Sequence, residues 1–174
     1  MKINRDILIE SDRLSIRKLT MDMCYDIHQN SLDEDNRRFV PDEVFETLEV
    51  ATAVVNSLIE SYEEEDGPFV FAIFRKEDNA NIGYIQLVKI DLGWEIGYHI
   101  AKRYTGNGYA TEAVKLFLDY LKDNTDYKEI YGVALSANKA SRRVLQKSGF
   151  ELFFEGIDFY QGKKRKIIKS IIRL

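Results

Sequence analysis

Two closely spaced glycines, Gly106 and Gly108, stand in a short polar segment whose residue types could bind a phosphate group. The segment reads Arg103-Tyr104-Thr105-Gly106-Asn107-Gly108-Tyr109-Ala110. Glycines permit positive φ and leave the backbone amides open to a ligand. An amphipathic helix is expected directly afterwards, and its first N–H groups and positive dipole end would join the site. The segment therefore predicts an anion site, although a glycine-rich turn that only connects two elements would have the same composition.

Two better-known phosphate motifs do not fit this segment. A dinucleotide-binding fingerprint needs a third glycine at position 111, which is occupied by Thr111. A P-loop needs lysine followed by serine or threonine after the last glycine, where Tyr109 and Ala110 stand. Both motifs are excluded by spacing.

The elements that must position these residues indicate a mixed α/β fold. Alternating or continuous apolar residues predict about seven strands, at 14–19, 69–74, 82–90, 94–100, 130–135, 150–160 and 166–173. Apolar residues that recur every three to four positions predict about four helices, at 22–32, 44–62, 110–121 and 140–145. The strands from 69 to 100 should form an antiparallel meander, whereas the strand, helix and strand over 94–135 should be a parallel unit.

Composition limits the class of protein. The chain has 174 residues, of which 45% are hydrophobic, so we expect one domain over residues 1–174 with a sizeable core. A net charge of −4 argues against binding nucleic acid, and no segment approaches the ~20 apolar residues of a membrane span. The single cysteine, Cys24, is expected to be a small buried residue and provides neither a disulfide nor a metal cluster. A cytoplasmic protein without a metal is predicted.

The glycine segment resembles the pyrophosphate loop of the GNAT acyltransferase superfamily. In that family the pattern is Arg or Gln, two residues, Gly, one residue, then Gly or Ala, which Arg103, Gly106 and Gly108 match. Further segments resemble the branch that acts on ribosomal-protein N-termini (RimJ/RimL-like): 11–17, 95–98, 112–113, 138–141 and 147–150. The resemblance covers about residues 10 to 160 in the expected order. It implies the GNAT fold, a mixed but mostly antiparallel sheet with a V-shaped splay between its fourth and fifth strands, here 94–100 and 130–135.

The resemblance also implies acetyl-CoA as cofactor. The backbone of Tyr98, His99 and Ile100 would pair with the pantetheine arm. The diphosphate would lie on the amides of Arg103, Tyr104, Thr105, Gly106, Asn107, Gly108, Tyr109 and Ala110, with Thr111 next in the helix. Asn138 and Ser141 would lie near the sulfur. Lys147, with Arg142 and Arg143, could meet the adenosine phosphate or could simply be solvated.

Transfer of an acyl group to an amine needs a base for the amine and a proton for the thiolate. Glu95 is the first candidate base, acting directly or through water, and His99 is the second. Alternation puts Glu95, Gly97 and His99 on one face of their strand, so Tyr98 is nearer the substrate if that face is turned away. A half-buried glutamate can also be only a paired structural charge.

The proton donor is sought on the helix predicted at 140–145. Many members of the superfamily place a tyrosine on the helix after the asparagine, where this chain has Leu145. Ser141 on the same helix is the nearest replacement, although its hydroxyl could instead bond the backbone. His28 is interpreted as a surface or capping residue, Trp94 as core or cofactor wall, and the basic segment 163–166 as an exposed hairpin tip.

These observations predict an N-acetyltransferase that moves acetyl from acetyl-CoA to a primary amine by direct attack. An α-amine, with a pKa of about 7.7 to 8.0, loses its proton more readily than a lysine at about 10.4. A protein N-terminus is therefore the leading acceptor. A small amine, such as a polyamine, amino sugar or antibiotic, and a non-catalytic acyl-CoA-binding sensor are the alternatives. Homodimers are common in the family.

Overall fold

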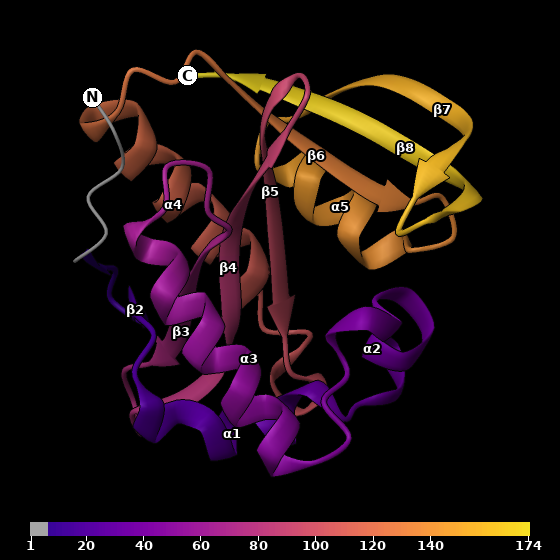
Figure 1. The fold of residues 1–174 in the computed structure, drawn as a ribbon. Helices are drawn as coiled ribbons and strands as arrows, with labels where there is room; N and C mark the ends of the chain where they lie inside the picture. Colours follow the sequence, from indigo (N-terminus) through magenta and orange to yellow (C-terminus); the bar gives the residue numbers. More distant parts are fainter. Residues whose placement is uncertain (1–6) are drawn as a thin grey trace.

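One sheet of eight strands runs through the computed structural model, which describes residues 7–174 (Figure 1). The strand order is β1-β2-β3-β4-β5-β6-β8-β7. The strands are β1 (Leu8–Glu10), β2 (Leu14–Lys18), β3 (Phe69–Arg75), β4 (Ala80–Ile90), β5 (Gly93–Ile100), β6 (Glu129–Leu135), β7 (Glu151–Tyr160) and β8 (Lys163–Arg173). The α-helices are α1 (Cys24–Ser31), α2 (Glu34–Phe39), α3 (Leu48–Glu60), α4 (Tyr109–Asn124) and α5 (Lys139–Lys147).

The sheet opens between β5 and β6, its only parallel neighbours among the described strands. These two strands share two register pairs, Trp94 with Ile130 and Glu95 with Tyr131. Beyond Glu95 the strands diverge, while β4 continues along β5 and β8 continues along β6 (Figure 1). The mixed, mostly antiparallel sheet and its predicted opening are both present.

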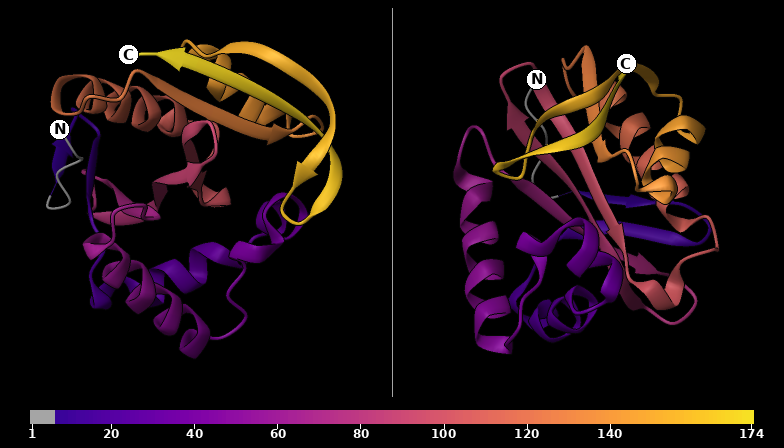
Figure 2. Two further views of the ribbon diagram at one scale, coloured as in Figure 1. Left: turned by 45° about the horizontal axis from the view of Figure 1, so that its top comes forward. Right: turned by 90° about the vertical axis from the view of Figure 1, so that its right-hand side faces the viewer.

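Helices cover the two faces of the sheet. Figure 2 shows α1 and α3 on one face and α4 and α5 on the other. The buried stripe of α4 explains its position, since Phe117 packs on Phe71 of β3 with ring centroids 5.7 Å apart. The tip of the β7–β8 hairpin reaches α2, where the Gln161 Nε2 atom donates to the Phe39 carbonyl at 3.4 Å.

The core interpretations of two residues are confirmed. Trp94 is buried between Phe69 and Tyr127, with ring centroids 5.5 Å from each. Cys24 is buried and free. No helix within residues 7–174 combines the length and the apolar character that crossing a membrane requires.

Three local elements differ from the prediction. The three-residue strand β1 makes eight strands rather than seven, because it is too short to show an alternating pattern. The helix α2 was missed because its sequence, EDNRRF, has no apolar stripe; the Asp33 side chain caps it by accepting from the Asn36 N–H. The helix α3 begins at Leu48 rather than 44, because Thr47 caps it and Pro41–Glu43 form a separate 3₁₀ turn.

Candidate functional site

The segment before α4 forms an open cradle of backbone amides. Gly106 and Gly108 have φ of 84° and 80°, and Gly108 is the N-cap of α4 with no side chain bonded to it. The Glu112 N–H donates to the Gly108 carbonyl at 3.1 Å, so the N–H groups of Tyr109, Ala110 and Thr111 precede the intrahelical ladder. A Cβ atom at Gly106 would meet nothing within 4 Å. The space and the donors fit an anion such as a diphosphate.

The N-terminal strands hold this cradle in place. The Arg13 Nε atom donates to Glu112 in the first turn of α4 at 2.9 Å, and its Nη1 atom donates to the Asn107 carbonyl at 3.2 Å. The Ser11 hydroxyl donates to the same Glu112 carboxylate at 2.6 Å. Sequence analysis used both segments as motifs but missed that they contact each other, because about 95 residues separate them.

The side chains of the segment mostly support its own backbone. The Asn107 amide donates to the Tyr104 carbonyl at 3.0 Å, and the Thr105 hydroxyl donates to the Lys102 carbonyl at 2.8 Å. The exposed Arg103 guanidinium lies over the Tyr104 ring, 4.8 Å from its centroid. The predicted ligand groups in this segment are therefore main-chain amides.

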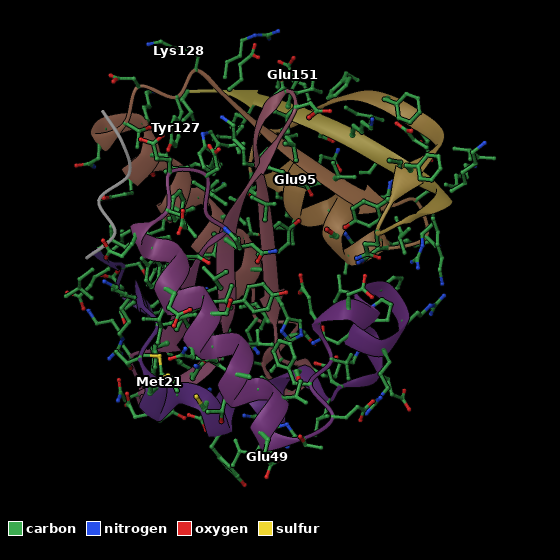
Figure 3. The ribbon with its side chains drawn as sticks, in the orientation of Figure 1. Met21, Glu49, Glu95, Tyr127, Lys128 and Glu151 are labelled. Carbon is green, nitrogen blue, oxygen red and sulfur yellow. The ribbon has the colours of Figure 1, made fainter. Side chains whose placement is uncertain are left out.

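A cavity of about 90 Å³ occupies the opening between β5 and β6, and we call it the cleft. Glu95 lies at its apex, in the last register pair before the strands diverge (Figure 3). Tyr98 projects to the α5 side, where its hydroxyl lies 3.0 Å from Ser141 Oγ and donates to the Ser141 carbonyl at 3.1 Å. Burial raises the pKa of Tyr98, partly opposed by its hydrogen bond with Ser141.

The helix α5 closes the far wall of the cleft. Asn138 caps it by accepting from the Ser141 N–H at 3.0 Å, and both residues line the cleft as expected. Leu145 is only 1% exposed and packs on Gly132, where an added Cβ would lie 2.5 Å from Leu145 Cδ2. Its role at the position of the family's tyrosine is packing.

Three residues expected to meet the cofactor lie away from the cleft walls. Ile100 is buried in the core at the end of β5, so only its backbone is available. Lys147 is exposed in the last turn of α5. Arg142 forms an ion pair with Glu155 at 2.9 Å, which makes it a structural cation.

The second face of β5 carries Glu95, Gly97 and His99, as alternation predicts. This face is turned toward α1 and α3, since an added Cβ at Gly97 would lie 2.6 Å from Gln86 Nε2 and the His99 ring lies beside Tyr84. Burial raises the pKa of Glu95 to about 7, with a smaller opposing effect of the Lys169 charge. A carboxyl with this pKa can exchange a proton near neutral pH.

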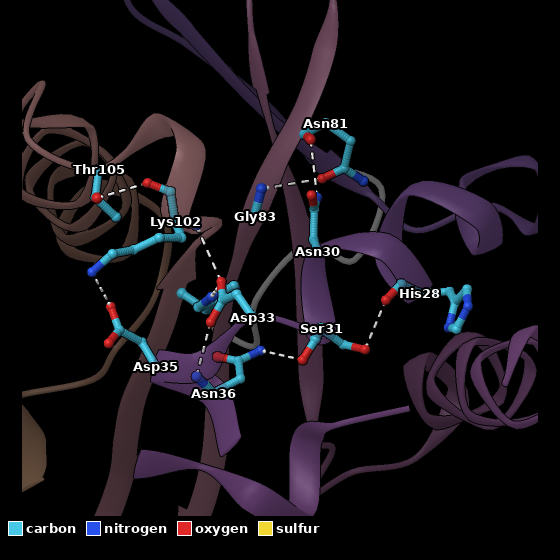
Figure 4. Close-up of polar contacts among 11 residues, drawn as sticks. His28, Asn30, Ser31, Asp33, Asp35, Asn36, Asn81, Gly83, Lys102 and Thr105 are labelled. Carbon is cyan, nitrogen blue, oxygen red and sulfur yellow. Dashed lines mark hydrogen bonds and ion pairs between the residues drawn. The ribbon is translucent and has the colours of Figure 1, made fainter. Parts of the chain in front are cut away.

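A second carboxylate, Asp33, fixes His99. The Asp33 Oδ2 atom lies 3.2 Å from His99 Nε2. The same oxygen accepts from the Lys102 N–H at 3.1 Å (Figure 4). Burial by itself raises the pKa of Asp33. Hydrogen bonds from His99 and from the backbone N–H groups of Asn36 and Lys102 have the larger combined effect and lower this pKa to about 2. An ionised carboxylate only accepts, so His99 Nε2 carries a proton and Nδ1 is the acceptor of the neutral ring.

A larger cavity, of about 250 Å³, lies between α1, α3 and the sheet, and we call it the α1–α3 cavity. It shares three lining residues with the cleft: Glu43, Tyr84 and Gln86. Burial raises the pKa of Glu43, with a smaller opposing effect of its hydrogen bond from Gln86 Nε2 at 3.4 Å. Sequence analysis missed Glu43, which stands in a 3₁₀ turn and belongs to no motif. His28 lines neither cavity and bonds the Phe45 carbonyl at 2.8 Å, consistent with a structural role.

Known proteins share this sequence pattern and this fold. The family profile described as acetyltransferase (GNAT) domain matches residues 13–151. The uncharacterized N-acetyltransferase YoaA of Bacillus subtilis (strain 168) is 27% identical over 147 residues, covering 83% of this chain and 82% of the relative.

Solved structures superpose over nearly the whole chain. A GNAT-family acetyltransferase from Bacillus anthracis has a TM-score of 0.82 at 25% identity, over 96% of this chain and 98% of that one. RimL, a ribosomal L7/L12 α-N-protein acetyltransferase in complex with coenzyme A, has a TM-score of 0.81 over 97% of this chain and 98% of its own. At 18% identity, the likeness to RimL shows the fold alone.

Proposed function

The chain belongs to the acetyltransferase (GNAT) domain family, and from this premise we propose that it acetylates the α-amine of a protein or peptide N-terminus. It is an acetyl-CoA-dependent N-acetyltransferase, as the family match and the relative YoaA indicate. The proposal about the acceptor is supported by structural neighbours that include ribosomal-protein N-terminal acetyltransferases, and by the proton-accepting groups of the site.

The residues of the site fit acetyl-CoA. In our proposal the amides of 106–111 hold its diphosphate, and the free edge of β5 at Tyr98, His99 and Ile100 pairs with its pantetheine arm. The open space over Gly106 and the uncapped start of α4 support this assignment. When bound, acetyl-CoA supplies an acetyl group activated as a thioester.

The observation that carries the proposal is the position of Glu95, a half-buried carboxyl at the apex of the cleft whose pKa is raised to about 7. An amine attacks a carbonyl carbon only when it has lost its proton. We assign Glu95 to accept that proton, directly or through a water molecule. A base of this strength is matched to an α-amine with a pKa of about 7.7 to 8.0 rather than to a lysine at about 10.4.

The departing thiolate needs a proton when the carbon–sulfur bond breaks. Ser141 and Tyr98 place two hydroxyl groups 3.0 Å apart on the α5 side of the cleft. We propose that this pair donates the proton, with the Ser141 hydroxyl as the donor and the Tyr98 hydroxyl as its hydrogen-bond partner. His99 remains the second candidate base, held by Asp33.

The test compares two peptides that differ only in which amine is free. One has a free N-terminus and no lysine; the other has a blocked N-terminus and one lysine. We expect release of coenzyme A to be at least about tenfold faster with the free N-terminus near pH 7, because its amine is less basic. Faster reaction with the lysine peptide would contradict an α-amine acceptor.

An amine panel with polyamines and amino sugars separates the other acceptors. Turnover with those amines alone would assign the site to a small amine. Tight binding of acetyl-CoA without thiol release from any amine would identify a sensor.

A further inference from the structure

The walls of the α1–α3 cavity are made mainly of hydrocarbon. The apolar lining comes from five parts of the chain and is composed of Leu19, Ile27, Phe45, Val54, Val55, Leu58 and Val70. Its volume is about 250 Å³, which is the volume of about eight water molecules at ~30 Å³ each. A side chain with about eight heavy atoms has a similar volume. Such walls give water few partners, so an apolar group is the favoured occupant.

The lining side chains of this cavity that can carry a charge near neutral pH are two carboxyl groups and the imidazole of His99. Asp42 and Glu43 line it, and no lysine or arginine of the described residues does. Glu43 also lines the cleft, where its Oε2 atom has no hydrogen-bond partner. This free acceptor atom can bind an ammonium group at the junction of the two cavities, where no described lysine or arginine is present to pair with a carboxylate or phosphate.

Two buried amides add a neutral polar feature to the lining. Asn30 and Asn81 are 5% and 2% exposed. Asn30 Nδ2 donates to the Asn81 carbonyl at 3.0 Å, and Asn81 Oδ1 accepts from the Gly83 N–H at 3.2 Å (Figure 4). Asn30 Oδ1 and Asn81 Nδ2 have no partner. One acceptor and one donor of this kind complement the N–H and the carbonyl of an amide.

We infer that the acceptor is an α-amine whose carbon atom also bears a bulky apolar side chain and is followed by a neutral amide, as in an N-terminal phenylalanine, leucine or methionine. The side chain fills the α1–α3 cavity, and the amine lies beside Glu43 at the junction with the cleft. This inference rests on the proposed function and narrows its acceptor. It excludes small first residues such as alanine and serine as the preferred acceptors.

Three amino-acid derivatives of similar amine basicity test the inference. Coenzyme A release is measured with phenylalaninamide, alaninamide and phenylalanine methyl ester. We expect kcat/KM for phenylalaninamide to exceed that for alaninamide by at least about tenfold, because the cavity is apolar and large. The ester lacks the N–H donor, so its kcat/KM should be several-fold lower than that of the amide.

The second part of the experiment uses a variant of the cavity wall. Val54→Phe fills the cavity and should lower kcat/KM for phenylalaninamide by at least about tenfold more than it lowers kcat/KM for alaninamide. Val50→Phe is the matched control, since Val50 lies on the same helix, is 47% exposed and lines neither cavity. Thermal unfolding of both variants shows whether they fold.

Each result has one meaning. Equal rates for phenylalaninamide and alaninamide, or equal loss with both amides in Val54→Phe, would overturn the inference while acyl transfer stands. So would turnover with polyamines or amino sugars and none with these derivatives. Failure to bind acetyl-CoA in calorimetry would instead overturn the proposed function.

Discussion

The cradle before α4 and the α1–α3 cavity, the two halves of our proposed site, are made from different parts of the chain. The cradle uses the backbone of one continuous segment, 103–111, and its side chains mainly brace that backbone. The α1–α3 cavity is built from residues on three α-helices, one 3₁₀ turn, three strands and two connections. Its composition is therefore set by packing between segments that are distant in sequence.

This difference predicts how each half responds to substitution. In a site made of backbone groups, ligand affinity depends on the glycines and little on most side chains. In a cavity lined by side chains, substitution of a wall residue changes which acceptor is preferred. Glu95 stands at the cleft apex, and Glu43 stands where the cleft and the α1–α3 cavity meet. Substitutions in the two halves should therefore separate cofactor affinity from acceptor preference.

The largest loss of activity is expected from substitution of Glu95, which lies at the cleft apex, outside both the cradle and the α1–α3 cavity. Glu95→Gln removes the base, so kcat should fall by about 10²–10⁴-fold. In the native protein, activity should rise as pH increases through about 7, where Glu95 loses its proton. The variant should lose that rise and keep only the rise set by the amine. Steady-state kinetics from pH 5 to 9 checks this, and an unchanged profile would exclude Glu95 as base.

The same variant has a predicted effect on stability. Burial raises the pKa of Glu95 from its ordinary 4.5 to about 7, so the folded state favours the protonated carboxyl. The native protein should therefore lose stability relative to Glu95→Gln as pH rises from about 4.5 to about 7, with no further loss above that. Thermal unfolding as a function of pH measures this difference.

The next largest effect is expected on acetyl-CoA affinity, from a substitution in the cradle. Gly106→Ala and Gly162→Ala each place a Cβ at positive φ, 84° and 69°, with nothing within 4 Å. Each should lose about 1 kcal/mol of stability. Only Gly106→Ala should also weaken acetyl-CoA binding, by at least about tenfold, because several hydrogen bonds from backbone N–H groups to the diphosphate are lost. Calorimetry with coenzyme A decides this, and equal affinities in the two variants would place the diphosphate elsewhere.

Substitutions of the hydroxyl pair should have a smaller effect. Ser141→Ala should lower kcat by about 10- to 100-fold, and Tyr98→Phe by less, since Tyr98 acts through Ser141. Coenzyme A affinity should change little in either variant. A thioester whose leaving thiol is more acidic should restore part of the rate of Ser141→Ala, because it needs no proton donor. Failure of such a substrate to react faster would contradict proton donation by Ser141.

The smallest effect is expected on stability, from substitution of Asp33, which holds His99. Asp33→Asn keeps the helix cap but removes the charge, and should lower stability at neutral pH by about 1 kcal/mol. The Asp33 pKa is lowered from 3.8 to about 2, so its contribution is present above about pH 4 and is lost as pH falls to about 2. The variant should lack this acid-dependent loss. The control is Asp35→Asn, an exposed partner of Lys102, which should change neither stability nor activity.

Local patterns were enough for much of the fold. The continuous apolar run at Phe69–Phe74 and the apolar stripe of α4 predicted their elements within a few residues, because a strand buried on both faces is apolar throughout and a helix buried on one face is apolar with the helical period. The polar helix α2 and the strand β1 were missed, since contacts with distant segments rather than an apolar period hold them. The helix α3 was predicted too long because Thr47 provides a cap inside an apolar run.

For the site, the residues of the cleft were predicted on β5 and α5, while Glu43, Arg13 and Asp33 were not. Glu43 and Asp33 are short polar residues in connections, and such residues are common in any chain. Their position becomes informative only when the fold places Glu43 at a junction of cavities and Asp33 beside His99.

The sequence by itself determined the family, the amide cradle and the identity of the strands that separate, because each depends on residues close together in the chain. Only the tertiary structure decided which face of β5 looks toward α1 and α3, which hydroxyl meets Ser141 and what lines the second cavity. Those features depend on contacts between segments separated by tens of residues, and the order of amino acids does not reveal such contacts without the fold.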